Sequence, residues 1–122
     1  MSNLRPVEIK AFVPAKDYEL SKRFYRDIGF KMASDGGGVA YFHWEHVSFL
    51  LMDSPTEGSA ACLNMHLLVE DVDAWYARVQ ESGIVSKYGV EVTAIAQQPW
   101  RMRDFGLIDP SGVEWRIAQN TD

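Results

Sequence analysis

Two side chains near the end of the sequence are well suited to bind a small molecule. Trp100 presents a flat, amphipathic ring that can stack on a planar ligand. Arg116 carries a guanidinium that can pair with a carboxylate or phosphate. An internal salt bridge from Arg116 to Glu8 or Glu114 is the competing interpretation. The neighbouring Trp115 has the opposite strand parity and is expected in the core.

The sequence offers no recognisable nucleophile or phosphate-binding loop. Ser48 and Ser111 have no histidine at a spacing that suggests a catalytic pair. Cys62 is interpreted as a small buried apolar residue at the start of a strand. The run Gly36–Gly38 does not lead from a strand into a helix, which favours a hairpin turn over a phosphate cradle. We therefore expect no catalytic residues.

Four residues could bind a metal on the basis of their side chains alone: His43, Glu45, His46 and His66. The sequence contains no His-x-His and no His-x-x-x-His pair, so half-exposed strand histidines are the simpler interpretation. His66 lies two residues after Asn64, so both should share one strand face.

Composition limits the possible partners. The 122 residues are 47% hydrophobic and 24% charged, which is typical of one soluble globular domain. The formal net charge of -5, without a basic patch, argues against nucleic acid as a partner. A single cysteine excludes an internal disulfide and a cysteine-based zinc site. Neither a signal peptide nor a membrane-spanning run is recognisable, so we expect a cytoplasmic protein with no membrane partner.

Two segments share one strand-then-helix pattern, with VEIKAFVPA and CLNMHLLVE as the predicted strands. Asp17 and Asp71 are each predicted to cap the N-terminus of a helix. Gly29 and Gly83 follow at the same spacing and are each predicted to end it. Because only two copies fit in the sequence, the pattern indicates a duplicated module rather than a solenoid.

Further strands are expected after each predicted helix. They are FKMAS, VAYFHWE and HVSFLLM in the first half, and VEVTAIAQ, RDFGLI and EWRIAQ in the second. Asp35–Gly38 and Asp109–Gly112 are predicted turns.

These elements predict an α+β fold in a single domain, residues 1–122. It should consist of two βαβββ modules, at about residues 6–53 and 61–119, joined by a polar linker over residues 53–60. Neither module could cover both faces of its sheet with one helix. We expect the two to form a curved mixed sheet with the helices outside and a concave face within.

Two motifs resemble signatures of the glyoxalase/bleomycin resistance/dioxygenase superfamily, also called the vicinal oxygen chelate proteins. SKRFYRDIGF is similar to the helix and turn after that family's first strand, and WRMRDFGLIDPSGVEWRI is similar to its closing signature. The nearest likeness is to the bleomycin resistance proteins, short acidic chains with a similar QPW loop, here Gln98–Trp100. The sequence has Arg101 where that loop often has glycine. The resemblance implies a homodimer whose two subunits together build two clefts.

The resemblance also implies where a metal would be held. Metal-dependent members use His, Gln or Glu side chains from the first and last strands of each half, and the corresponding positions here are Lys10, Phe49, Asn64 and Arg116. Phenylalanine and protonated lysine and arginine offer no lone pair to a cation, and the two positive charges would repel it. We therefore expect no metal and no cofactor.

The cleft is expected to be lined by these positions, by their same-face partners and by the loop tryptophan. The ligand-binding residues expected are Lys10, Phe12, Phe49, Leu51, Asn64, His66, Trp100 and Arg116. We expect a metal-independent small-molecule-binding protein of the bleomycin resistance type, which sequesters an antibiotic or related planar ligand in a cleft at the dimer interface. Lys10 and Arg116 oppose a cationic ligand unless each forms an internal salt bridge. The alternative is an enzyme of the same superfamily, a lyase or dioxygenase, with an atypical metal site.

Overall fold

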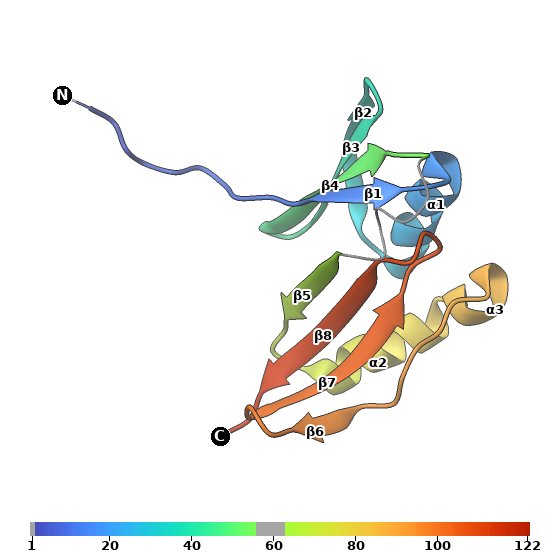
Figure 1. Ribbon diagram of the computed structural model, residues 1–122. Coiled ribbons are helices and arrows are strands. Elements are labelled where there is room, and N and C mark those ends of the chain that lie inside the picture. The colour runs from blue at the N-terminus through green and yellow to red at the C-terminus, as the bar shows by residue number, and fades with distance from the viewer. Residues whose placement is uncertain (1, 56–62) are drawn as a thin grey trace.

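The computed structural model describes residues 2–55 and 63–122, so Cys62 and most of the predicted linker lie outside the described residues. Two similar halves follow one another along the chain (Figure 1). The first half contains β1 (Phe12–Ala15), α1 (Tyr18–Ile28), β2 (Lys31–Gly36), β3 (Val39–Trp44) and β4 (Val47–Asp53). The second half contains β5 (Asn64–Leu68), α2 (Val72–Glu81), α3 (Ile84–Tyr88), β6 (Ala96–Gln98), β7 (Met102–Ile108) and β8 (Glu114–Asn120). No helix within the described ranges has the length and apolar character needed to cross a bilayer.

Each half forms one four-stranded mixed sheet. The strand orders are β1-β4-β3-β2 and β5-β8-β7-β6. In each sheet the first strand pairs in parallel with the last, and the remaining pairs are antiparallel. The predicted α+β fold is therefore confirmed, with the strands divided between two separate sheets.

The predicted helix starts are confirmed. The side chain of Asp17 accepts a hydrogen bond from the amide of Leu20 at 3.2 Å, and that of Asp71 accepts one from the amide of Ala74 at 3.0 Å. Each carboxylate thereby satisfies an amide that has no partner within its helix. The short helix α3, which begins directly after Gly83, was not predicted.

The predicted turns also form. Gly37 and Gly38 connect β2 to β3 with φ angles of 63° and 81°, as a two-residue hairpin turn requires. Before β8, one carboxylate oxygen of Asp109 accepts hydrogen bonds from the amides of Ser111 and Val113, both at 2.9 Å. The Asp-Pro-Ser-Gly turn is thus fixed by its own first residue.

Two predicted strands are shorter than expected. Residues 2–11 precede β1 as an arm without regular secondary structure; its N-terminal part extends away from the rest of the molecule (Figure 1), whereas Glu8 and Ala11 form hydrogen bonds to the first sheet. Residues 90–95 form a bridge between Val92 and Leu107 and backbone hydrogen bonds to β7 but no regular strand, and Ala96–Gln98 form the strand β6.

One core lies between the helix-facing sides of the two sheets. Tyr25 of α1 packs against Phe49 of β4 and Trp115 of β8, with ring centroids 4.9 and 5.7 Å apart. The Tyr25 hydroxyl donates to Asp109 at 2.5 Å and accepts a hydrogen bond from the indole nitrogen of Trp115 at 2.9 Å. Trp115 is therefore in the core, as predicted. Because both sheets turn one face toward this core, their other faces, termed here the open faces, point away from it.

Candidate ligand-binding faces

The open face of the first half is aromatic at its centre. Strand register places Phe12, Tyr41 and Leu50 side by side, and Phe12 is 53% exposed. Phe49 and Leu51 point the other way, because successive strand residues alternate between faces. They are 2% and 0% exposed in the core, so the expectation that they line a cleft is wrong, and Leu50 occupies the open face instead.

A carboxylate organises the polar groups of this face. Glu8 accepts hydrogen bonds from Lys10, Tyr41 and Ser48, each at 2.8 Å. The bond from Lys10, followed by those from the two hydroxyls, lowers the pKa of Glu8 to about 2. Lys10 is therefore held in an internal ion pair, the alternative that the sequence left open.

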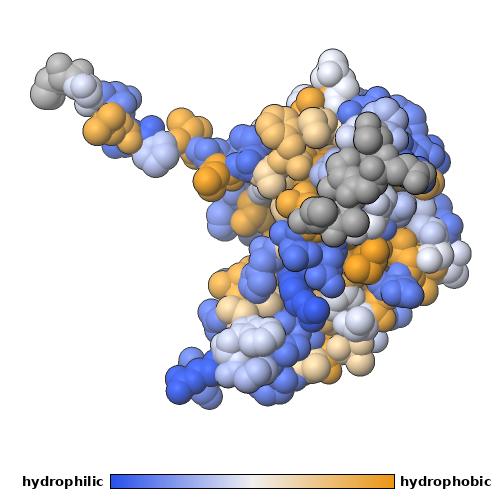
Figure 2. Space-filling view, in the orientation of Figure 1, coloured by the Kyte–Doolittle hydropathy of each residue, from blue (hydrophilic) through white to orange (hydrophobic). Residues whose placement is uncertain are grey.

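A recess of about 440 Å³ lies over this cluster. The space-filling view shows a hollow below the extended arm, between the two halves of the molecule (Figure 2). The lining of the recess is mostly polar and comes from the arm and the first sheet: Val7, Glu8, Ala33, Tyr41, His43, Glu45, His46 and Ser48.

The open face of the second half carries the remaining strand residues predicted for the cleft. Asn64 and His66 of β5 are exposed and pair in register with Glu114 and Arg116 of β8. Paired residues of parallel strands project to the same face, so these four side chains share one surface. Asn64, His66 and Arg116 are thus brought together, as predicted, but on a different sheet from Lys10 and Phe12.

A buried carboxylate lies behind Arg116. Asp104 of β7 is 1% exposed, and its Oδ1 accepts hydrogen bonds from Gln98 at 2.9 Å and Arg116 at 3.3 Å. Glu114 lies 4.0 Å from the other terminal nitrogen of Arg116. The second oxygen of Asp104 has no hydrogen-bond partner in the described parts of the chain. The guanidinium is therefore oriented and neutralised by carboxylates of its own chain.

The predicted loop tryptophan lies at the turn between β6 and β7. Trp100 is 58% exposed, and the turn is closed by a hydrogen bond from the amide of Arg101 to the carbonyl of Gln98. Arg101 has a φ of 63°, a left-handed conformation that glycine adopts without strain. This explains why glycine suits the position in similar loops. Arg103 of β7 forms a two-bond ion pair with Asp73.

The positions that would hold a metal in similar proteins do not fit one here. Lys10 and Arg116 are protonated and engaged by carboxylates, and Phe49 is in the core. Asn64 supplies a neutral amide oxygen, which alone cannot hold a divalent ion. Across residues 2–55 and 63–122, no three His, Cys, Asp or Glu side chains gather closely enough to bind a metal.

Several polar residues of the open faces were not predicted as site residues: Glu8, Tyr41, Ser48, Gln98 and Asp104. Alternation provides a signal for two of them. Asp104 has the parity opposite to the buried Phe105 of β7, and Tyr41 has the parity opposite to the buried Phe42 of β3. The contact between Glu8 and Ser48 is between residues far apart in the sequence and had no such signal.

Solved structures with the same fold include both binding proteins and an enzyme. A bleomycin-binding protein complexed with bleomycin superposes with a TM-score of 0.82 at 20% identity, over 94% of this chain and 99% of that one. TnmS3, an antibiotic binding protein from Streptomyces sp. CB03234, gives 0.73 at 26% identity, over 98% and 100% of the two chains. Lactoylglutathione lyase from Agrobacterium tumefaciens gives 0.68 at 20% identity, over 94% and 95%.

Sequence comparison agrees with the fold. No curated protein matches the chain. The family model described as Glyoxalase/Bleomycin resistance protein/Dioxygenase superfamily matches residues 8–117, almost the whole of the two halves. The motifs noted in the helix after the first strand and in the closing hairpin both lie inside this range. The chain belongs to the glyoxalase/bleomycin resistance protein/dioxygenase superfamily.

Proposed function

We propose that this protein binds and sequesters a planar, polar small molecule, such as an antibiotic, without a metal ion and without changing it chemically. The observation that carries the proposal is that Lys10 and Arg116 are both held in ion pairs. They occupy positions where metal-dependent relatives would hold an ion, and each is fixed in an ion pair with a carboxylate of its own chain. A basic side chain held in such an ion pair neither coordinates a metal nor transfers a proton, but it presents a rigid polar surface to a ligand.

The proposed cleft requires a second copy of the chain. Both sheets turn their helix-facing sides to one core, so the open faces diverge and neither covers the other. β1 and β5 are edge strands, and the arm before β1 exposes Leu4, Val7 and Ile9 almost fully. Free strand edges and exposed apolar side chains favour association. In a homodimer, an open face of one subunit would be closed by the partner.

The proposed ligand has a flat ring and mixed polarity. Phe12 and Trp100 are exposed aromatic side chains, and aromatic rings favour planar partners. The fixed charges of Lys10 and Arg116 are balanced by adjacent carboxylates, which removes the objection to a cationic ligand that the sequence raised. The antibiotic-binding proteins with this fold, TnmS3 among them, support this class of ligand.

Fluorescence titration of the intact protein tests the proposal. Bleomycin and a panel of planar antibiotics would be added while indole emission is followed. For a compound that binds, Trp100→Ala and Phe12→Ala should each weaken affinity about three- to tenfold, as the loss of one aromatic contact implies. Val85→Ala removes an exposed apolar side chain from α3 and is the matched control. Affinities that fall equally in all three variants would refute a site on the open faces.

A lyase is the second candidate, because the lactoylglutathione lyase from Agrobacterium tumefaciens has the same fold. It predicts that the purified protein contains one divalent ion per site and that chelation abolishes lyase activity. Substoichiometric metal in every preparation would exclude it.

A further inference from the structure

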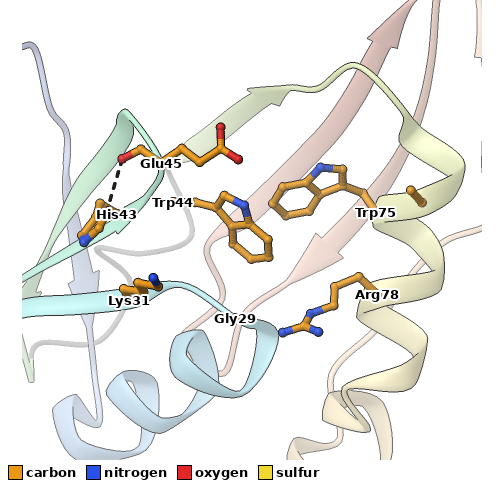
Figure 3. Close-up of a pocket in the computed structure, with 8 residues that line it drawn as sticks. Gly29, Lys31, His43, Trp44, Glu45, Trp75 and Arg78 are labelled. Carbon is orange, nitrogen blue, oxygen red and sulfur yellow. Dashed lines mark hydrogen bonds between the residues drawn. The ribbon is translucent and has the colours of Figure 1, made fainter.

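A second recess lies on the helix side of the first sheet, where the two halves meet (Figure 3). Its volume is about 580 Å³, within the range of small-molecule sites. It is lined by the end of the β3–β4 hairpin, the start of β2 and one side of α2: Gly29, Lys31, His43, Trp44, Glu45, Ala74, Trp75 and Arg78. Trp44 and Trp75 belong to this recess and not to the open faces.

Two indoles form its apolar wall. The rings of Trp44 and Trp75 lie 4.4 Å apart between centroids and are tilted by 45°, and both contact Phe30 of the core. Gly29 leaves space at the base of the recess, because a Cβ at this position would lie only 2.9 Å from the Trp44 ring. The wall is therefore rigid and wide enough to take a flat ring.

A guanidinium is held beside the indoles. Nε of Arg78 donates to the carbonyl of Ile28 at 2.8 Å, and its central carbon lies 6.0 Å from the Trp44 ring centroid. Over the described residues, neither Arg78 nor Lys31 has a carboxylate within ion-pair distance. Glu45 lies on the opposite side of the indole pair from Arg78 (Figure 3). Arg78 thus lies beside the indole pair without a carboxylate partner among the described residues, and Lys31 lies on the other side of the recess (Figure 3).

We propose that this recess is a second ligand-binding site, on the helix side of the first sheet, which takes a planar aromatic anion; it shares His43 and Glu45 with the recess of the open face but is distinguished by Trp44, Trp75 and Arg78. The ring would contact Trp44 and Trp75, and its carboxylate or sulfonate would accept hydrogen bonds from Arg78. An amino substituent at the other end would face the carboxylate of Glu45. The terminal nitrogens of Arg78 provide the planar, two-pronged donor geometry that suits such an anion.

Two probes that differ by one charge test the proposal. 8-Anilinonaphthalene-1-sulfonate carries the anion, and N-phenyl-1-naphthylamine is the same ring system without it. Binding to the intact protein would be followed by energy transfer from indole to probe. We expect the sulfonate to bind at least about tenfold more tightly than the neutral probe, as a hydrogen bond to a charged group implies.

Substitutions then locate the site. Arg78→Gln should weaken the sulfonate about tenfold and leave the neutral probe unchanged. Arg26→Gln, which removes a basic side chain from the last turn of α1, is the matched control and should change neither. Ala74→Glu adds bulk and negative charge on the exposed side of α2, where glutamate near the helix start keeps the helix stable. It should weaken the sulfonate more than Ala74→Gln does.

The results that overturn the proposal are distinct from those for the open faces. Equal affinity of the two probes, no binding of either, or unchanged sulfonate affinity in both Arg78→Gln and Ala74→Glu would each refute the recess as an anion site. Trp100→Ala, which tests the open faces, should leave sulfonate binding unchanged.

Discussion

Replacing Tyr25 with phenylalanine should destabilise the fold more than any change at an exposed tyrosine. Tyr25→Phe keeps the ring packing against both sheets and removes only the hydroxyl. That hydroxyl donates to Asp109 at 2.5 Å and accepts from the indole of Trp115 at 2.9 Å, and all three residues are at most 4% exposed. The substitution leaves a buried carboxylate oxygen and a buried indole N–H without this partner.

The cost follows from these two bonds. A hydrogen bond to a charged group contributes about 1.5–3 kcal/mol, and a buried donor left unsatisfied costs about 1–3 kcal/mol. Because phenylalanine is more apolar than tyrosine, we take the low end of each range, about 2.5 kcal/mol together. For a domain of this size that corresponds to a fall in Tm of about 10 °C.

Thermal and urea unfolding at pH 7, followed by circular dichroism, measure this effect. Tyr18→Phe is the matched control, because its hydroxyl donates to Asp35 in an exposed ion-pair cluster and its loss should cost less than about 1 kcal/mol. The urea m value should stay unchanged in both variants.

The pH dependence provides a second check. Burial raises the pKa of Asp109, and the hydrogen bond from Tyr25 opposes that shift. A raised pKa means that the folded chain binds the proton more tightly than the unfolded one, so protonation of Asp109 favours folding. The loss in Tyr25→Phe should therefore shrink as the pH falls from 7 to about 4. A decrease in Tm smaller than about 3 °C, or an equal loss of unfolding free energy at both pH values, would refute this reasoning.

Three further outcomes are expected. Arg101→Gly should stabilise the fold by about 0.5–1 kcal/mol in urea unfolding, because it relieves a left-handed φ of 63°, and a lower midpoint would contradict this. Gly29→Ala should cost at least about 2 kcal/mol, since φ is 131° and the added Cβ would lie 2.7 Å from a guanidinium nitrogen; an unchanged Tm would show that the neighbours move freely. Asp27, Asp35 and Asp73 have pKa values lowered, chiefly by hydrogen bonds from basic side chains. The stability that they contribute should be present above their ordinary pKa of 3.8 and lost below it, so the triple Asn variant and the natural chain should converge in unfolding free energy near pH 2.

The sequence predicted features that depend on neighbouring residues. Asp17 and Asp71 cap their helices, and Asp109 fixes the turn before β8, because each carboxylate reaches an amide only two to four residues away. Such contacts form whatever the rest of the chain does, so a short sequence pattern is sufficient to find them.

The parity of β4 could not be predicted in the same way. Its central residues, Phe49, Leu50 and Leu51, are all apolar, so no alternation distinguishes the two faces. The choice is made by packing of Phe49 against Tyr25 of α1, a contact that depends on the assembled sheet. For this reason the expected cleft residues Phe49 and Leu51 are each one position away from Leu50, the residue that lies on the open face.

The partners of the two cleft cations were predicted only in part. The sequence suggested Glu8 or Glu114 as partners, and both lie beside a cation, Lys10 and Arg116 respectively. The closer partner of Arg116 is Asp104, at 3.3 Å across two antiparallel strands. Strand register decides this contact, and register was not available from the spacing of the residues.

The most direct test of the account measures binding and chemical integrity together. Protein stripped of divalent ions with EDTA would be equilibrated with bleomycin and the antibiotic panel, and bound compounds would be recovered and analysed by mass spectrometry. We expect at least one compound to bind with the same affinity before and after chelation and to be recovered with its mass unchanged. Failure of the whole panel to bind, or conversion of a compound only when a divalent ion is restored, would contradict it.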